Sequence, residues 1–68
     1  MMRLRVNGLE TEILATTVAE LLAAQGIDPA TRFLAVAVNG VVVRRPEWAS
    51  LRLAAGDEVE IVRPLSGG

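Results

Sequence analysis

The residues best suited to chemistry stand at the end of the sequence, where Gly67 and Gly68 follow Pro64, Leu65 and Ser66. Glycine has no Cβ, so a Gly-Gly pair can lie extended in a slot too narrow for any other residue. Glycines are also common at frayed chain ends, so the pair alone leaves both interpretations open.

The remaining composition offers few groups for catalysis. The 68 residues include no cysteine and no histidine, and all seven basic residues are arginine. Disulfides, thiolate metal sites, thiol nucleophiles and the usual general base near neutral pH are therefore excluded. Arginine stays protonated and forms no Schiff base. We expect a protein that is not an enzyme, with no catalytic residue, no metal site and no bound cofactor.

Two pairs of carboxylates could suggest acid-base or metal chemistry. Glu10 and Glu12 alternate along a predicted strand, which favours a solvated face of a sheet. Asp57-Glu58 follows a glycine and has no further ligand nearby in the sequence, which favours a turn. We interpret neither pair as a site.

Charge and hydropathy limit the partners. The formal net charge is −1, the only aromatic residues are Phe33 and Trp48, and there is no basic run, so a nucleic-acid partner is not expected. No apolar run approaches the roughly 20 residues of a membrane span. The first residues lack the apolar region of a signal peptide, and we expect a cytoplasmic protein with no membrane association.

The elements before the tail begin with a hairpin and a helix. Residues 3–6 alternate polar and apolar, Asn7-Gly8 is a strong signal for a type I′ turn, and residues 9–14 form the returning strand. Thr17 and Glu20 match a capping box, in which the Glu20 side chain reaches back to the Thr17 amide. The helix is predicted over about residues 18–25, ending at Gly26, with an apolar stripe formed by Val18, Leu21 and Leu22.

A second hairpin and a last strand complete the domain. The apolar run 33–38 and residues 41–43 form strands around the turn signal Asn39-Gly40. Trp48 is expected to close one end of the core. Residues 59–62 form the last strand, which Pro64 ends because it lacks a backbone donor.

These elements predict an α+β fold of the ubiquitin-like β-grasp kind, in which a mixed sheet packs on one main helix. The last strand is expected to lie beside the first and parallel to it, so that it is held on both sides. The predicted domain spans residues 1–63, and residues 64–68 form a flexible C-terminal tail with a firmly anchored base.

In this order the chain resembles the ubiquitin-like sulfur carriers and, among them, the ThiS family of thiamine biosynthesis. The proline of residues 44–46 stands later than in the family pattern, which affects only the local turn. The likeness is carried by residues 4–8, 17–22, 37–44 with Trp48, and 56–62 with Gly67-Gly68.

The resemblance implies a carrier whose C-terminal Gly68 reacts. An E1-like adenylyltransferase of the ThiF type would use ATP and Mg²⁺ to adenylate the Gly68 carboxylate. Sulfur from a cysteine desulfurase or persulfide donor would then replace AMP, and the thiocarboxylate would supply sulfur to a thiazole synthase of the ThiG type. Gly67 would permit passage through a narrow active site, and Ser66, Leu65 and Pro64 would complete the partner-binding tail.

Other interpretations remain open at this point. A sulfur carrier of another pathway, such as the small subunit of molybdopterin synthase, shares the fold and the Gly-Gly end. A ubiquitin-like modifier would be conjugated through Gly68 to lysines of other proteins. A plain β-grasp interaction module would need no free C-terminus.

Overall fold

Two hairpins form where the Asn-Gly pairs predict them. In the computed structural model Asn7 and Gly8 have φ of 50° and 82°, and Asn39 and Gly40 have φ of 52° and 81°. These left-handed conformations are those of type I′ turns, whose twist matches that of the flanking strands. The structure describes residues 1–63. Their elements are β1 (Met2–Val6), β2 (Leu9–Ile13), α1 (Val18–Ala24), β3 (Ala35–Val38), β4 (Val41–Val43), η1 (Arg45–Glu47) and β5 (Glu58–Val62).

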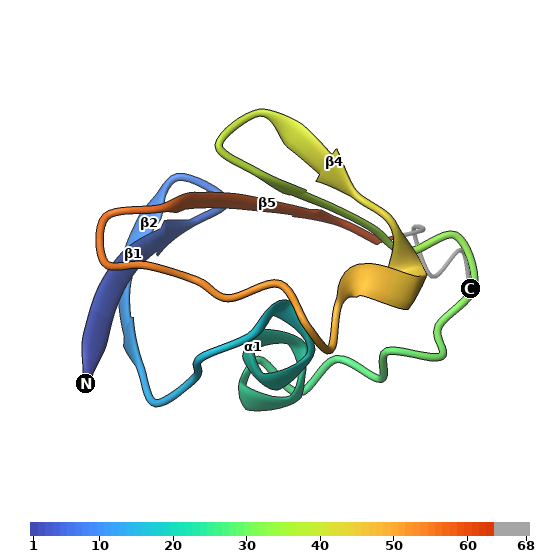
Figure 1. Cartoon of the computed structure of the whole chain (residues 1–68), viewed down its shortest axis with the longest axis horizontal. Helices are drawn as coiled ribbons and strands as arrows, with labels where there is room; N and C mark the ends of the chain where they lie inside the picture. Colours follow the sequence, from blue (N-terminus) through green and yellow to red (C-terminus); the bar gives the residue numbers. More distant parts are fainter. Residues whose placement is uncertain (64–68) are drawn as a thin grey trace.

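The strands of residues 1–63 form one mixed sheet in the order β2-β1-β5-β3-β4. The last strand, β5, lies between the two hairpins, parallel to β1 and antiparallel to β3. The helix α1 lies across one face of this sheet (Figure 1). The predicted β-grasp arrangement, including the parallel placement of the last strand beside the first, is therefore confirmed.

The helix begins at Thr17, whose hydroxyl accepts a hydrogen bond from the Glu20 amide at 3.2 Å. The other half of the predicted capping box is largely replaced by contacts with Thr16. The Glu20 carboxylate accepts from the backbone amide and the hydroxyl of Thr16, both at 2.7 Å, and the Thr17 amide contributes less. Hydrogen bonds from Thr16 lower the pKa of Glu20 below its ordinary value. The helix ends at Ala24, and Gly26 follows with φ of 74°.

The core of the described residues is entirely apolar and lies between α1 and the sheet. Trp48 closes one end of it, as predicted: the side chain is 4% exposed and its indole N–H donates to the Val43 carbonyl at 2.9 Å. The Arg45 guanidinium lies over the Trp48 ring at 4.5 Å. The most deeply buried side chains are Leu4, Val18, Leu21, Leu22, Val36 and Val59.

The apolar run 33–38 does not form a strand along its whole length. Phe33 has φ of 62° and is 77% exposed, and β3 begins only at Ala35. The left-handed conformation turns the chain out of the extended line, so the ladder starts two residues later than predicted. Phe33 is therefore not a core anchor.

Candidate functional site

All five residues of the predicted site, Pro64, Leu65, Ser66, Gly67 and Gly68, lie outside the described residues. The structure does place the strand that leads to them, β5, together with everything that holds it.

Strand β5 is bonded to β1 on one edge in its first half and to β3 on the other edge. On the β1 side, the Arg5 amide donates to the Asp57 carbonyl at 2.9 Å and the Asn7 amide to the Val59 carbonyl at 2.8 Å. On the β3 side, the antiparallel register runs from Val38 opposite Val59 to Ala35 opposite Val62. We call the last residues of β5, Ile61 and Val62, the root of the tail, and this root lies in the central strand of the sheet.

The asparagine of the first hairpin turn also contacts β5 through its side chain. The Asn7 Oδ1 atom accepts from the Ile61 amide at 2.7 Å, and Nδ2 donates to the Ile61 carbonyl at 3.3 Å. One side-chain amide thereby binds both backbone groups of a residue 54 positions away. The sequence interpretation assigned Asn7 only to the turn and missed this contact.

The asparagine of the second turn holds the opposite end of the same strand. The Asn39 Oδ1 atom accepts from the Glu58 amide, and Nδ2 donates to the Asp57 carboxylate, both at 3.0 Å. The other Asp57 oxygen accepts from the Ala54 amide at 2.8 Å, which closes the turn before β5. Asp57 is therefore a turn residue, as predicted, and residues 1–63 contain no cluster of acidic side chains that could hold a metal ion.

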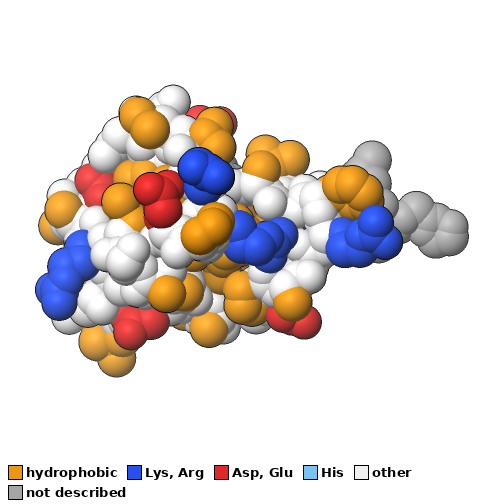
Figure 2. Space-filling view, turned by 45° about the vertical axis from the view of Figure 1, so that its right-hand side comes forward, with side chains coloured by type: hydrophobic (Ala, Val, Ile, Leu, Met, Phe, Trp, Pro, Cys, Tyr) orange, Lys and Arg blue, Asp and Glu red, His pale blue; other side chains and the backbone are white. Residues whose placement is uncertain are grey.

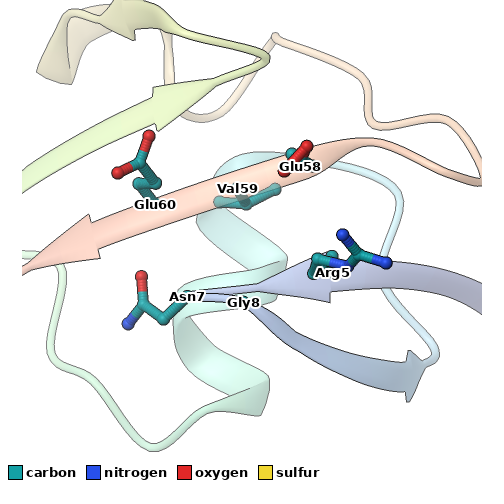
Figure 3. A pocket seen from close by; sticks show the side chains of 6 residues that line it. All are labelled: Arg5, Asn7, Gly8, Glu58, Val59 and Glu60. Carbon is teal, nitrogen blue, oxygen red and sulfur yellow. The ribbon is translucent and has the colours of Figure 1, made fainter.

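Beside the Asn7 contact lies an open depression of about 490 Å³ (Figure 3). It is lined by Arg5, Asn7, Gly8, Glu58, Val59 and Glu60. Arg5 and Glu58 occupy paired positions of β1 and β5, so the depression follows the seam between these strands.

The exposed face of the sheet divides into two halves. On β1 and β2, Arg3 is paired with Glu12 and Arg5 with Glu10 in the strand register, so this half is charged. The half formed by β3, β4 and the end of β5 carries a shallow apolar hollow of about 150 Å³. Its lining residues are Ala35, Val36, Ala37, Val42, Glu60 and Val62.

On the face seen in Figure 2, arginine, acidic and hydrophobic side chains are interspersed and form no basic stripe of the kind that binds nucleic acid. Within residues 1–63 no helix has the length and hydropathy needed to cross a membrane.

A model of the ThiS family matches residues 4–68. A crystal structure of the thiamine biosynthesis protein ThiS from Geobacter metallireducens is similar, with a TM-score of 0.79 and 31% identity over 98% of this chain and 100% of that chain. An NMR structure of a thiamine biosynthesis protein from the same organism has a TM-score of 0.79 and 30% identity over 98% and 88% of the two chains. No match was found among curated protein sequences.

Proposed function

Because the chain belongs to the ThiS family, we propose that it is the sulfur carrier for the thiazole step of thiamine biosynthesis. The observation that carries the proposal is the extent of the match, which runs from residue 4 to residue 68 and so includes both the domain and the Gly-Gly tail. Both similar structures are of thiamine biosynthesis proteins, which favours the thiamine pathway over the molybdopterin pathway.

In this proposal the reacting group is the carboxylate of Gly68. An E1-like adenylyltransferase catalyses attack of a carboxylate oxygen on the α-phosphorus of ATP, with Mg²⁺ and with pyrophosphate as the leaving group. The resulting acyl-adenylate has an electrophilic carbonyl carbon, at which the terminal sulfur of a persulfide, on a cysteine desulfurase or another persulfide donor, attacks and AMP leaves. The acyl disulfide formed is cleaved by a thiol of the donor system, which takes up the other sulfur as a disulfide and leaves a thiocarboxylate on Gly68. The thiocarboxylate that results delivers its sulfur to a thiazole synthase.

The chemistry of the chain fits a carrier better than a catalyst. Without cysteine, histidine or lysine, the chain has neither a thiolate to attack its own acyl-adenylate nor a side-chain amine to capture it. The catalytic groups must then come from the partner enzymes. Gly67 gives the tail the narrow cross-section that such an active site needs, and Pro64, Leu65 and Ser66 are proposed to contact the partners along its entrance.

The fold of the described residues suits presentation of such a tail. Strand β5 is bonded to β1 on one edge and to β3 on the other, so the tail begins from the middle of the sheet and not from a loose edge. A partner that binds the domain therefore meets the tail at a reproducible place, which reduces the entropy lost when the reacting group enters its active site.

The proposal is tested by mass spectrometry of the intact protein after incubation with host extract, ATP and cysteine. Exchange of one oxygen for sulfur has nearly the mass of one methionine oxidation, and Met1 and Met2 are both present. The sample is therefore also treated with a thiol-directed alkylator. Since the chain contains no cysteine, a rapid adduct must lie on acquired sulfur, and fragmentation is expected to place it on Gly68.

The matched control is a chain lacking Gly68. We expect it to keep the thermal transition of the full chain, because no part of the core is removed, and to acquire no alkylatable sulfur. Sulfur on the shortened chain, or none on the full chain while a known carrier is charged in the same extract, would contradict the proposal. Covalent adducts with other proteins on a denaturing gel would instead indicate a modifier.

A further inference from the structure

At the last hydrogen-bonded position between the parallel strands β1 and β5, a side chain takes the place of the backbone. In a regular parallel pair, a residue that donates to position 59 of its neighbour accepts from position 61 through its own carbonyl. The Asn7 amide donates to the Val59 carbonyl in this way. The Ile61 amide, however, donates to the Asn7 side chain at 2.7 Å, because the backbone at Asn7 has turned into the hairpin with φ of 50°.

The side-chain amide of Asn7 thus takes the place of two backbone groups of the first hairpin. It offers an acceptor to the Ile61 N–H and a donor to the Ile61 carbonyl, the roles that the Asn7 carbonyl and the Leu9 amide would have if β1 continued as a regular parallel strand. Figure 3 shows this side chain projecting alongside β5 from the point where β1 ends. Without it, the β1 edge of Ile61 would have no partner from the first hairpin, and that part of β5 would be held by β3 alone.

We propose that Asn7 is a positioning residue for the C-terminal tail, acting through Ile61. This inference rests on the proposed function, in which partner enzymes act on Gly68. Ile61 is the last buried residue of β5, and six residues separate it from Gly68. If Ile61 leaves the β1 edge, the last residue held on that edge is Val59, two positions earlier, and the rest of β5 up to Val62 is paired with β3 alone. An end of the strand that is held on one edge only can open more readily, which makes the position of the tail less well defined.

The second hairpin provides a matched control. Asn39 has the same turn position, nearly the same φ and the same following glycine, and its side chain also makes two hydrogen bonds next to β5. These bonds hold Glu58 and Asp57 at the start of the strand, at the end remote from the tail. Loss of Asn39 should therefore weaken the fold without loosening the root of the tail.

The test compares Asn7→Gly with Asn39→Gly. Glycine adopts the left-handed conformation readily, so both variants keep their type I′ turn and lose only the side-chain bonds. Amide hydrogen exchange is measured first, residue by residue, on the isolated protein at a temperature where both variants are folded. We expect exchange of the Ile61 amide, measured relative to the slowest-exchanging amides of the core in the same variant, to rise roughly tenfold in Asn7→Gly and to stay unchanged in Asn39→Gly, as the net contribution of one hydrogen bond implies.

The second measurement is adenylation by the pathway's E1-like enzyme, followed as pyrophosphate release. We expect Asn7→Gly to raise KM for the carrier roughly three- to tenfold with kcat little changed, because the chemistry at Gly68 is intact and only its presentation is impaired. Asn39→Gly should leave both constants near those of the unaltered chain.

Two outcomes would overturn the inference. Unchanged exchange at Ile61 in Asn7→Gly would show that the side chain does not hold the root, whatever the enzyme assay gives. An equal rise in KM for both variants would assign the effect to stability in general. If the unaltered chain is not adenylated at all, the proposed function fails, and the exchange data still decide separately whether Asn7 holds Ile61.

Discussion

The two faces of the sheet carry different kinds of side chain. The inner face packs on α1 and carries only apolar side chains among the buried residues of the described part. The outer face carries the Arg3–Glu12 ion pair, further charged residues and an apolar hollow. Strand β5 alternates strictly between the two: Val59 and Ile61 are buried, whereas Glu58, Glu60 and Val62 are exposed.

Because of this difference, we expect the same substitution at neighbouring residues of β5 to change the stability by very different amounts. Stability depends on the inner face because it holds the apolar area removed from water. On the outer face, substitutions are expected to change the stability little, because the side chains there remain exposed to water. Substitutions on the two faces can test this division, beginning with the strand that leads to the tail.

The largest expected effect is that of Ile61→Asp, since Ile61 is 8% exposed and aspartate would place an unpaired charge in the core. An uncompensated buried charge lowers the free energy of unfolding by about 3–5 kcal/mol. The total free energy of unfolding of a domain of this size is about 3–10 kcal/mol. We expect loss of the cooperative thermal transition by circular dichroism. Val62→Asp is the control: Val62 is 61% exposed, and a change within about 0.5 kcal/mol is expected.

A fully folded Ile61→Asp would show that the core assignment of β5 is wrong. Unfolding by Val62→Asp would show that the outer face also carries stability. Either result would show that the two faces of β5 do not differ in their contribution to stability at the residues next to the tail.

Much of this division could be predicted from the sequence, because it depends on local patterns. The alternation of β5, the two Asn-Gly turns and the helix cap at Thr17 each arise from residues within a few positions of one another. The placement of the last strand beside the first and parallel to it, held on both sides, followed from connecting these elements and is confirmed.

The contacts that the sequence did not predict join distant positions or depend on one backbone angle. Nothing near Asn7 indicates a bond to Ile61, because the partner is 54 residues away and the Asn-Gly pair already has an explanation as a turn. Thr16 and Thr17 both stand close before Glu20 in the sequence, and only the geometry shows that Thr16 donates the main hydrogen bonds to the Glu20 carboxylate. The left-handed φ of Phe33 has no signal in an apolar run, where an extended strand is the ordinary expectation.

An intermediate effect is expected where the inner face is closed by Trp48. Trp48→Phe removes the indole N–H and leaves the Val43 carbonyl without its partner, which should cost about 1–3 kcal/mol. The measurement is the urea midpoint by circular dichroism, because the variant has no tryptophan for fluorescence. Phe33→Ala is the matched aromatic substitution on an exposed side chain, and a change within about 0.5 kcal/mol is expected. Equal costs for the two variants would contradict the assignment of Trp48 to the core and Phe33 to the surface.

The smallest expected effect is that of the outer ion pair. The Arg3 Nη2 and Glu12 Oε2 atoms are 3.3 Å apart, and the two side chains are 65% and 56% exposed. Exposed pairs of this kind contribute about 0.2–1 kcal/mol, because water screens the charges and holding two long side chains costs entropy. A double-mutant cycle of Arg3→Gln and Glu12→Gln should give a coupling energy in this range, and it should fall further when the ionic strength is raised, since exposed charges are screened by salt. A coupling clearly above about 1 kcal/mol that persisted at high salt would place a significant share of the stability on the outer face. The division drawn along β5 would then hold for that strand alone and not for the sheet as a whole.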